Sequence, residues 1–416
     1  MQAGITDISL SGGGPKGAGH VGTLLALADF NMLPNIQRIN GTSVGALIGL
    51  LLAVGTSPED LAQLVREEDF KKLLDDDPKM LGNSGQPIIN MLNMYITIQL
   101  HDTLVAYSEI DQESPNITSN IKKIKAILTR LTEYQQTGNE AALNFTFADL
   151  NFLHRNDPSR FKHFSTNAVF RNTKGKLKSK IFDETKTPNI NLVDACRASA
   201  SLPLVLKPHA IEGEQYQDGG TLENTLWAPS RPATQQLMLV FRDPNSADLL
   251  DAWKKKEIDI SYANAKAYAN THLKYSFANR AIRNYAAHHA FPQKAIQGDK
   301  SMVEVREAGI RKLLEERPDS VLIVDTPGIT SSDFNKAKNK AEFLFLYNYF
   351  STARALIEKN MGTTPIPQGD ENANAFKQRI ELGMFLLKHF QAAGGEQAKT
   401  FNQTKRHARN LHKIDE

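Results

Sequence analysis

The stretch Gly41-Thr42-Ser43-Val44-Gly45 decides the fold expected for this chain. It has the pattern G-x-S-x-G, which places a serine at the tip of a sharp turn between a strand and a helix. Residues 38–40 before it suit a short strand, and residues 46–54 after it suit a buried helix. The two glycines permit the turn, so we expect an exposed serine hydroxyl above the positive end of a helix. The pentapeptide alone is equally compatible with a tight turn before a core helix.

A second glycine cluster, residues 11–17, follows a strand-like segment at residues 5–10 and precedes a helix-like segment at residues 18–30. Its N–H groups could bind a phosphate or the oxyanion of a tetrahedral intermediate. The spacing G-x-G-x-x-G also suits a dinucleotide site, but that site needs an acidic residue at the end of the next strand, where Gly41-Thr42-Ser43 stands instead. A Walker loop is excluded because Ala-Gly follows the last glycine. An oxyanion loop beside a nucleophilic serine is the simplest interpretation of both clusters.

A serine nucleophile needs a base, which is commonly a histidine oriented by a carboxylate. Asp218, which Gly219 and Gly220 follow, is placed to act directly as that base. Asp-Gly-Gly taken alone is commonly just a turn. The later histidines all lie in charged, helix-like stretches and suit solvent-facing positions: His272, His288, His289, His389, His407 and His412.

Three blocks together resemble those of the patatin-like phospholipases: Gly12–Gly17, Gly41–Gly45 and Asp218–Gly220. The order and combination are specific, although each block alone is not. The resemblance covers roughly residues 4 to 358, because further segments also agree with the family: Asp194–Pro203, Asn224, Val321–Ile329 and Asp333-Phe334.

This resemblance implies an α/β fold with a mainly parallel central sheet flanked by helices, and a Ser-Asp dyad without histidine. The resemblance further implies that Ser43 is the nucleophile, that Asp218 is the general base, and that the substrate is an acyl ester of a phospholipid. The resemblance implies neither a cofactor nor a metal. It assigns the oxyanion hole to Gly12, Gly13 and Gly14, and a supporting role in the motifs to Gly17, Gly41, Gly45, Gly219 and Gly220.

Composition agrees with such an enzyme. The chain has 416 residues, is 41% hydrophobic, and contains one cysteine, Cys196, in a small-residue segment that favours core packing. The net charge of +3 is too small for a nucleic-acid-binding protein, so we expect no nucleic acid partner. Basic clusters could touch anionic lipid, although a solvated face is the simpler explanation of any one of them. They are Lys174, Lys176, Lys178 and Lys180, then Lys254–Lys256, then Lys405-Arg406.

No segment reads as a signal peptide or a membrane span, because the longest apolar run, Val44–Val54, is too short to cross a bilayer. We therefore expect a soluble, cytoplasmic protein that is peripheral at phospholipid membranes. The resemblance extends to bacterial effectors with helical additions. It thus allows for secretion into a host cell without a cleaved signal peptide, and for a host protein as activator. A patatin-shaped binding module that recruits a partner is the alternative.

The chain divides into a catalytic domain at residues 1–360 and a helical extension at residues 361–416. Within the first, residues 56–160 read as a helical insertion or lid. The segment Ile88–Leu104 carries more apolar residues than one helix face can bury: Met91, Leu92, Met94, Tyr95, Ile96 and Ile98. The extension has an apolar stripe, which favours packing on its own domain over a membrane or partner contact: Phe376, Ile380, Met384 and Leu387.

Overall fold

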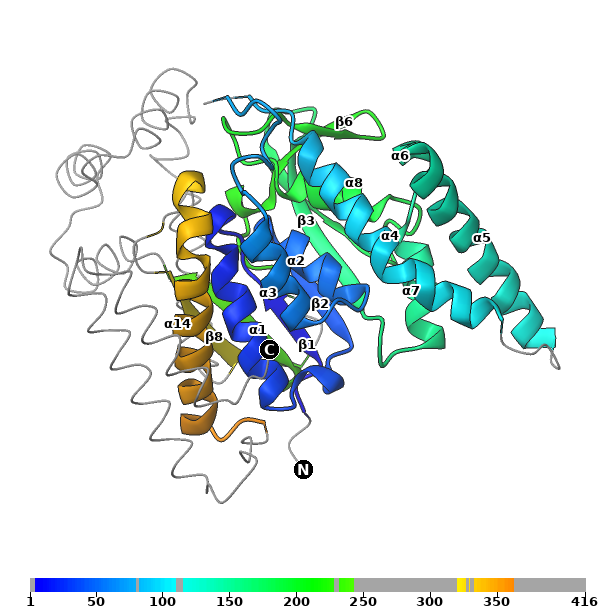
Figure 1. Ribbon diagram of the computed structural model, residues 1–416. Helices are drawn as coiled ribbons and strands as arrows, with labels where there is room; N and C mark the ends of the chain where they lie inside the picture. The colour runs from blue at the N-terminus through cyan, green and yellow to red at the C-terminus, as the bar shows by residue number, and fades with distance from the viewer. Residues whose placement is uncertain are drawn as a thin grey trace, which may run out of the picture.

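The computed structural model describes residues 4–79, 82–109, 115–227, 232–242, 320–326, 329 and 333–362. Its strands form one sheet of order β5-β6-β3-β2-β1-β7-β8. Strand β4 pairs with β3 over Thr166–Arg171, beyond the point where β2 ends. Helices flank this sheet, so the predicted α/β fold is confirmed (Figure 1). The strands are β1 (Asp7–Leu10), β2 (Arg38–Gly41), β3 (His163–Arg171), β4 (Leu177–Phe182), β5 (His209–Ile211), β6 (Glu214–Asp218), β7 (Gln236–Arg242) and β8 (Val321–Asp325).

The central strands are parallel, and their pairing register brings the two glycine motifs together. Leu10 at the end of β1 pairs with Gly41 at the end of β2. Strand β1 also pairs with β7, and β2 with β3, all in parallel. Because carboxyl ends of parallel strands meet at one edge, the loop after β1 and the turn after β2 lie side by side there. Strands β4, β5 and β6 add antiparallel hairpins on the β3 side.

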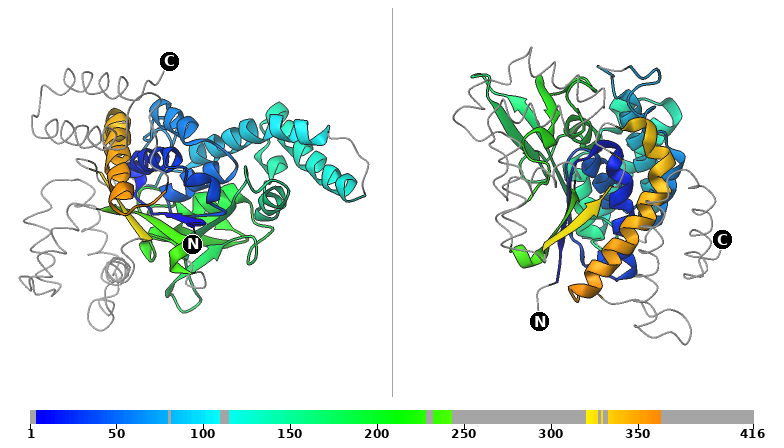
Figure 2. Two further views of the ribbon diagram at one scale, coloured as in Figure 1. Left: turned by 90° about the horizontal axis from the view of Figure 1, so that it is seen from below. Right: turned by 90° about the vertical axis from the view of Figure 1, so that its left-hand side faces the viewer.

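Helices α1 (Ala18–Asp29), α2 (Val44–Ala53) and α14 (Ala337–Glu358) lie on one face of the sheet (Figure 2, left). Helices α1 and α14 approach so closely that a Cβ on Gly22 would lie 2.4 Å from the Phe345 carbonyl oxygen. Helix α3 (Pro58–Glu67) begins as expected, with the Ser57 hydroxyl accepting the Asp60 N–H. Its Arg66 pairs with Glu342 of α14, so α3 belongs to this layer.

The helices that follow α3 stand partly apart from the sheet. They are α4 (Gln86–Ser108), α5 (Pro115–Thr137), α6 (Glu140–Leu143) and α7 (Phe147–Asn156). Helices α5 and α6 project away from the sheet in Figure 1, and α4 extends a few residues beyond the segment Ile88–Leu104 at each end. Helix α8 (Leu192–Ser199) then leads toward β5 and β6. We call α4–α6 the insertion. The division at residue 360 stays a prediction, and the apolar stripe at residues 376–387 lies outside the described residues.

Half of the apolar residues expected on the surface of α4 turn out to be core. Leu92 and Ile96 are fully buried, whereas Met94 is 44% exposed and Ile98 60% exposed. Their spacing explains the difference, because residues four apart share one helix face. None of the described helices has the length and hydropathy needed to cross a membrane. Across the same residues, no cluster of His, Cys, Asp and Glu has the makeup of a metal site.

Candidate active site

The turn between β2 and α2 holds Ser43 in a left-handed backbone conformation, with φ of +56°. A non-glycine residue in that region is strained, as is typical of a nucleophile elbow. The flanking residues must be glycines, because neighbouring backbone atoms approach them too closely to leave room for a side chain. A Cβ on Gly41 would lie 2.4 Å from the Gly45 carbonyl oxygen, and a Cβ on Gly45 would lie 2.3 Å from that of Leu10. The predicted strand–turn–helix context of the pentapeptide is therefore confirmed.

The serine hydroxyl meets the Asp218 carboxylate at the end of β6. Ser43 Oγ donates a hydrogen bond of 2.6 Å to Asp218 Oδ2, and the Gly220 N–H donates to Oδ1 at 2.7 Å. Both side chains are buried, at 7% and 3% exposure. The serine is thus less exposed than the turn alone suggests, because the glycine loop and the end of α8 cover it. This carboxylate is placed to receive the serine proton.

The glycine loop after β1 packs directly on the serine. A Cβ on Gly12 would lie 2.9 Å from the Cβ of Ser43. The Gly12 N–H donates to the Asn224 carbonyl at 2.9 Å, and Asn224 Nδ2 donates back to the Gly12 carbonyl at 2.9 Å. The backbone N–H of Gly12 is thus engaged in a hydrogen bond that holds the loop. Among the described residues, the Gly13 and Gly14 N–H groups have no hydrogen-bond acceptor.

Two buried contacts fix the start of the loop. His20 Nε2 donates to the Ser11 carbonyl at 2.8 Å, and the Phe241 N–H donates to the Ser11 hydroxyl at 2.9 Å. Complete burial lowers the pKa of His20 to about 4, so its ring is neutral near pH 7. Gly17 lets α1 and α2 start side by side, because a Cβ there would lie 2.6 Å from Val44 Cγ2.

Sequence reasoning missed two residues that hold the elbow. Ser199 at the end of α8 accepts the Ser43 backbone N–H through its hydroxyl, at 2.9 Å. Asn167 of β3 accepts the Thr42 hydroxyl at 2.7 Å, and a Cβ on Gly219 would lie 2.4 Å from its carbonyl oxygen. Asn167 follows Ser165 and Thr166 in β3, so the strand's sequence did not single it out. For Ser199 the segment was recognised, but nothing in it distinguished this serine from Ser201.

The other titratable candidates lie away from the dyad. Within the described part of the chain, no histidine forms a hydrogen bond with Ser43: His20, His101, His154, His163 and His209 all have other surroundings. The later histidines considered as bases lie outside the described residues. Cys196 is buried and its Sγ contacts the Ala46 carbonyl at 3.5 Å, as expected of a packing residue. Burial raises the pKa of its thiol well above the usual value.

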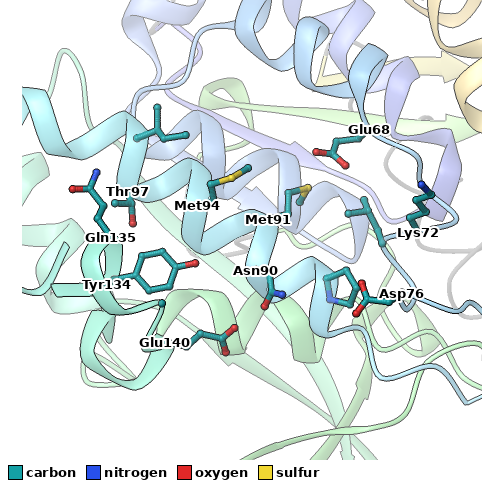
Figure 3. A pocket seen from close by; sticks show the side chains of 14 residues that line it. Glu68, Lys72, Asp76, Asn90, Met91, Met94, Thr97, Tyr134, Gln135 and Glu140 are labelled. Carbon is teal, nitrogen blue, oxygen red and sulfur yellow. The ribbon is translucent and has the colours of Figure 1, made fainter. Parts of the chain in front are cut away.

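A cavity of about 720 Å³ lies in the insertion and not at the dyad. It opens between α4, the segment after α3, and the α5–α6 region (Figure 3). Met91, Met94 and Tyr134 give it apolar walls, whereas Glu68 and Glu140 make part of its rim acidic. Neither Ser43, Asp218 nor a motif glycine lines it. The cavity therefore lies between the insertion and the segment after α3, apart from Ser43 and Asp218.

Two uncharacterized proteins of Acanthamoeba polyphaga mimivirus are similar to the chain. One is 27% identical over 222 residues, covering 53% of this chain and 59% of the viral protein. The other is 24% identical over 205 residues, covering 47% and 50%. The chain thus spans little more than half the length of these curated relatives.

The crystal structure of VipD from Legionella pneumophila has a similar fold, with a TM-score of 0.53 at 17% identity, covering 100% of this chain and 82% of VipD. A family model described as patatin-like phospholipase matches residues 8–230. That match includes β1, β2, β3 and β6, which carry the glycine loop, the elbow and the aspartate. Because this match covers more than half of its length, the chain belongs to the patatin-like phospholipase family.

Proposed function

We propose that this protein hydrolyses acyl esters of phospholipids through a Ser43–Asp218 dyad. The observation that carries the proposal is the 2.6 Å hydrogen bond from Ser43 Oγ to Asp218 Oδ2 in a buried setting. A serine hydroxyl needs a base within this distance to become a nucleophile at neutral pH. The family match and the glycine loop support the same assignment.

In the proposed reaction, Asp218 takes the Ser43 proton while Oγ forms a bond to the ester carbonyl carbon. The negative charge that develops on the carbonyl oxygen is stabilised by the N–H groups of Gly13 and Gly14. The bond to the leaving alcohol then breaks, and Asp218 returns the proton to that oxygen. In the second half, Asp218 removes a proton from a water molecule, whose oxygen attacks the carbonyl carbon of the acyl-enzyme. The bond from that carbon to Ser43 Oγ then breaks, Asp218 returns the proton to Oγ, and the fatty acid is released.

Phospholipid in a membrane surface is the proposed substrate, and the β3–β4 hairpin supports a membrane approach. Strand β2 ends opposite Thr166, whereas β3 continues to Arg171, about 17 Å further at the usual strand rise. The hairpin therefore projects from the sheet edge that bears Ser43. Lys174, Lys176 and Lys178 on it are exposed. Cations placed there attract an anionic surface, although the neighbouring hairpin carries Glu212 and Glu214.

A second candidate function is recruitment of a protein partner, including an activator, through the insertion. Exposed Met94 and Ile98 beside the cavity favour it, because apolar side chains grouped at a concave surface commonly mark a binding site. This function is compatible with catalysis at the dyad. Delivery into a host cell and action at membranes from the cytoplasm stay predictions.

The test is product analysis. Purified protein is incubated with vesicles of mixed phospholipids, with and without eukaryotic lysate, and lipids are analysed by mass spectrometry. We expect free fatty acid and lysophospholipid, and the same yield with EDTA. Products that form equally with a folded Ser43→Ala variant would refute the dyad.

A further inference from the structure

Arg197 of α8 is a fully buried cation, at 1% exposure. Its Nη1 donates to the Ser201 hydroxyl at 2.7 Å, and its Nη2 donates to the carbonyl oxygens of Ser84 at 2.6 Å and Lys207 at 3.1 Å. None of these acceptors is a carboxylate. A buried charge is costly unless it is well hydrogen-bonded, so a guanidinium placed among neutral oxygens fixes those three segments tightly.

One of the three segments is the entrance to the insertion. Ser84 lies in the loop that leads into α4, and this loop pairs with the segment before β5. The Gly82 N–H donates to the Leu204 carbonyl at 2.8 Å, and the Asn83 N–H donates to that of Val205 at 2.9 Å. The Arg197 guanidinium donates to both paired segments, to the Ser84 carbonyl in the loop and to the Lys207 carbonyl in the segment before β5.

The turn after Arg197 holds both members of the dyad. Ser199 Oγ accepts the backbone N–H of Ser43 at 2.9 Å, and the Ser201 carbonyl accepts the backbone N–H of Asp218 at 3.0 Å. The Ser201 hydroxyl in turn donates to the Arg197 carbonyl at 2.9 Å and accepts from its guanidinium. A shift of that guanidinium therefore moves the turn on which Ser43 and Asp218 both rest.

We propose that Arg197 is a positioning residue that couples the insertion entrance to the dyad. It acts through Ser199 and Ser201 and touches neither substrate nor reacting atoms. This role rests on the proposed hydrolase function, and it would let the insertion entrance influence the rate of hydrolysis. Whatever displaces the Arg197 guanidinium from its contact with this entrance loop changes the alignment of Ser43 with Asp218, and a misplacement of 1 Å costs up to about 100-fold in rate.

Two glycines in this loop provide a matched pair for the test. Gly82 and Gly85 both have left-handed backbones, with φ of +73° and +67°. A Cβ on Gly85 would lie 2.4 Å from Arg197 Nε and 2.7 Å from its Cζ, whereas a Cβ on Gly82 would meet nothing within 4 Å. Gly85→Ala and Gly82→Ala thus introduce the same kind of backbone strain, but only the first displaces the guanidinium.

Two readouts separate alignment from stability. The first is kcat and KM on a soluble short-chain ester, and the second is the rate at which a small fluorophosphonate labels Ser43. We expect Gly85→Ala to lower kcat and the labelling rate about 10- to 100-fold, with KM within about twofold. Gly82→Ala should stay within about twofold of wild type in all three, while both variants lose similar thermal stability. Equal labelling rates in two folded variants would overturn the proposal.

Arg197→Lys gives an independent measurement if Gly85→Ala does not fold. Lysine keeps the charge but loses the rigid fork that serves three acceptors. We expect slowed labelling of Ser43 at unchanged KM, and a wild-type labelling rate would overturn the proposal. A folded wild-type protein that neither labels nor hydrolyses the ester would instead remove the proposed function, and this role of Arg197 with it.

Discussion

Helices α2 and α4 are both strongly apolar, yet they lie in opposite environments. Helix α2 lies next to the sheet, and its apolar residues are buried almost throughout. Helix α4 buries one face, including Leu92 and Ile96, and leaves Met94 and Ile98 open beside a cavity. The first helix follows the turn that holds Ser43, and the second helix leaves apolar side chains exposed. Apolar composition alone therefore does not separate a core helix from a binding surface.

The glycines of the two regions differ in the same way. In the core, glycines permit contacts that a methyl group would block, as at Gly41 and Gly45. In the insertion, a Cβ on Gly138 would meet nothing within 4 Å. We therefore expect the core to be sensitive to small changes and the insertion to tolerate them. Substitutions in both regions can test that contrast.

The dyad should be the most sensitive point of the core. We expect Ser43→Ala and Asp218→Asn each to reduce vesicle hydrolysis by about 10⁴-fold or more, because each removes a group that acts only together with its partner. The measurement is fatty-acid release, with circular dichroism to verify folding. An Asp218→Asn variant with ordinary turnover would show that another base operates.

The difference between core and insertion glycines can be measured as a change in the free energy of unfolding. Gly45→Ala should lower the free energy of unfolding by about 3 kcal/mol, because its Cβ would overlap the Leu10 carbonyl. Gly138→Ala, in the insertion, has only the left-handed strain of its φ of +66° and should cost about 1 kcal/mol. Urea unfolding of both variants checks this. Similar urea midpoints for the two variants would mean that the core accommodates an added methyl group as readily as the insertion does.

His20, in the core, should make the free energy of unfolding depend on pH. Its pKa is about 4 in the folded protein, against an ordinary value of 6.5, so the unfolded chain binds more protons between these values. The stability contribution is complete above about pH 6.5 and decreases as pH falls, by about 3 kcal/mol at pH 4. A His20→Gln variant should lack this component. Parallel stability curves for wild type and variant from pH 7 to 4 would contradict it.

The smallest expected effects concern the two surfaces proposed for membranes and partners. Lys176→Ala with Lys178→Ala should reduce hydrolysis of anionic vesicles about 30-fold, since each lysine near such a surface contributes about 1 kcal/mol. Met94→Glu should reduce any stimulation of vesicle hydrolysis by eukaryotic lysate about tenfold, because it places a charge on the apolar surface proposed for a partner. Both variants should keep or exceed wild-type hydrolysis of a soluble short-chain ester. If only the insertion variant matters, the hairpin is simply a solvated face.

Local sequence was sufficient for much of the fold because the relevant signals act over short distances. The strand before the elbow, the helix after it and the Ser57 cap with Pro58 behind it all follow from neighbouring residues. The antiparallel strands near Asp218 were harder to predict. Strand β5 has only three residues and β6 is mostly polar. The two strands pair with each other, and β6 is also stabilised by pairing with β3, which lies far away in the sequence.

Local sequence patterns predicted the candidate groups: a serine on a sharp turn, a glycine loop and a later aspartate, each recognisable from its neighbours. Only the tertiary structure decided which groups meet. It brought Ser43 and Asp218 within hydrogen-bonding distance and bound the Gly12 N–H to Asn224. It also put Arg197 beneath the insertion entrance. These contacts join residues far apart along the chain, and no local pattern encodes them, because sheet register and helix packing set their geometry.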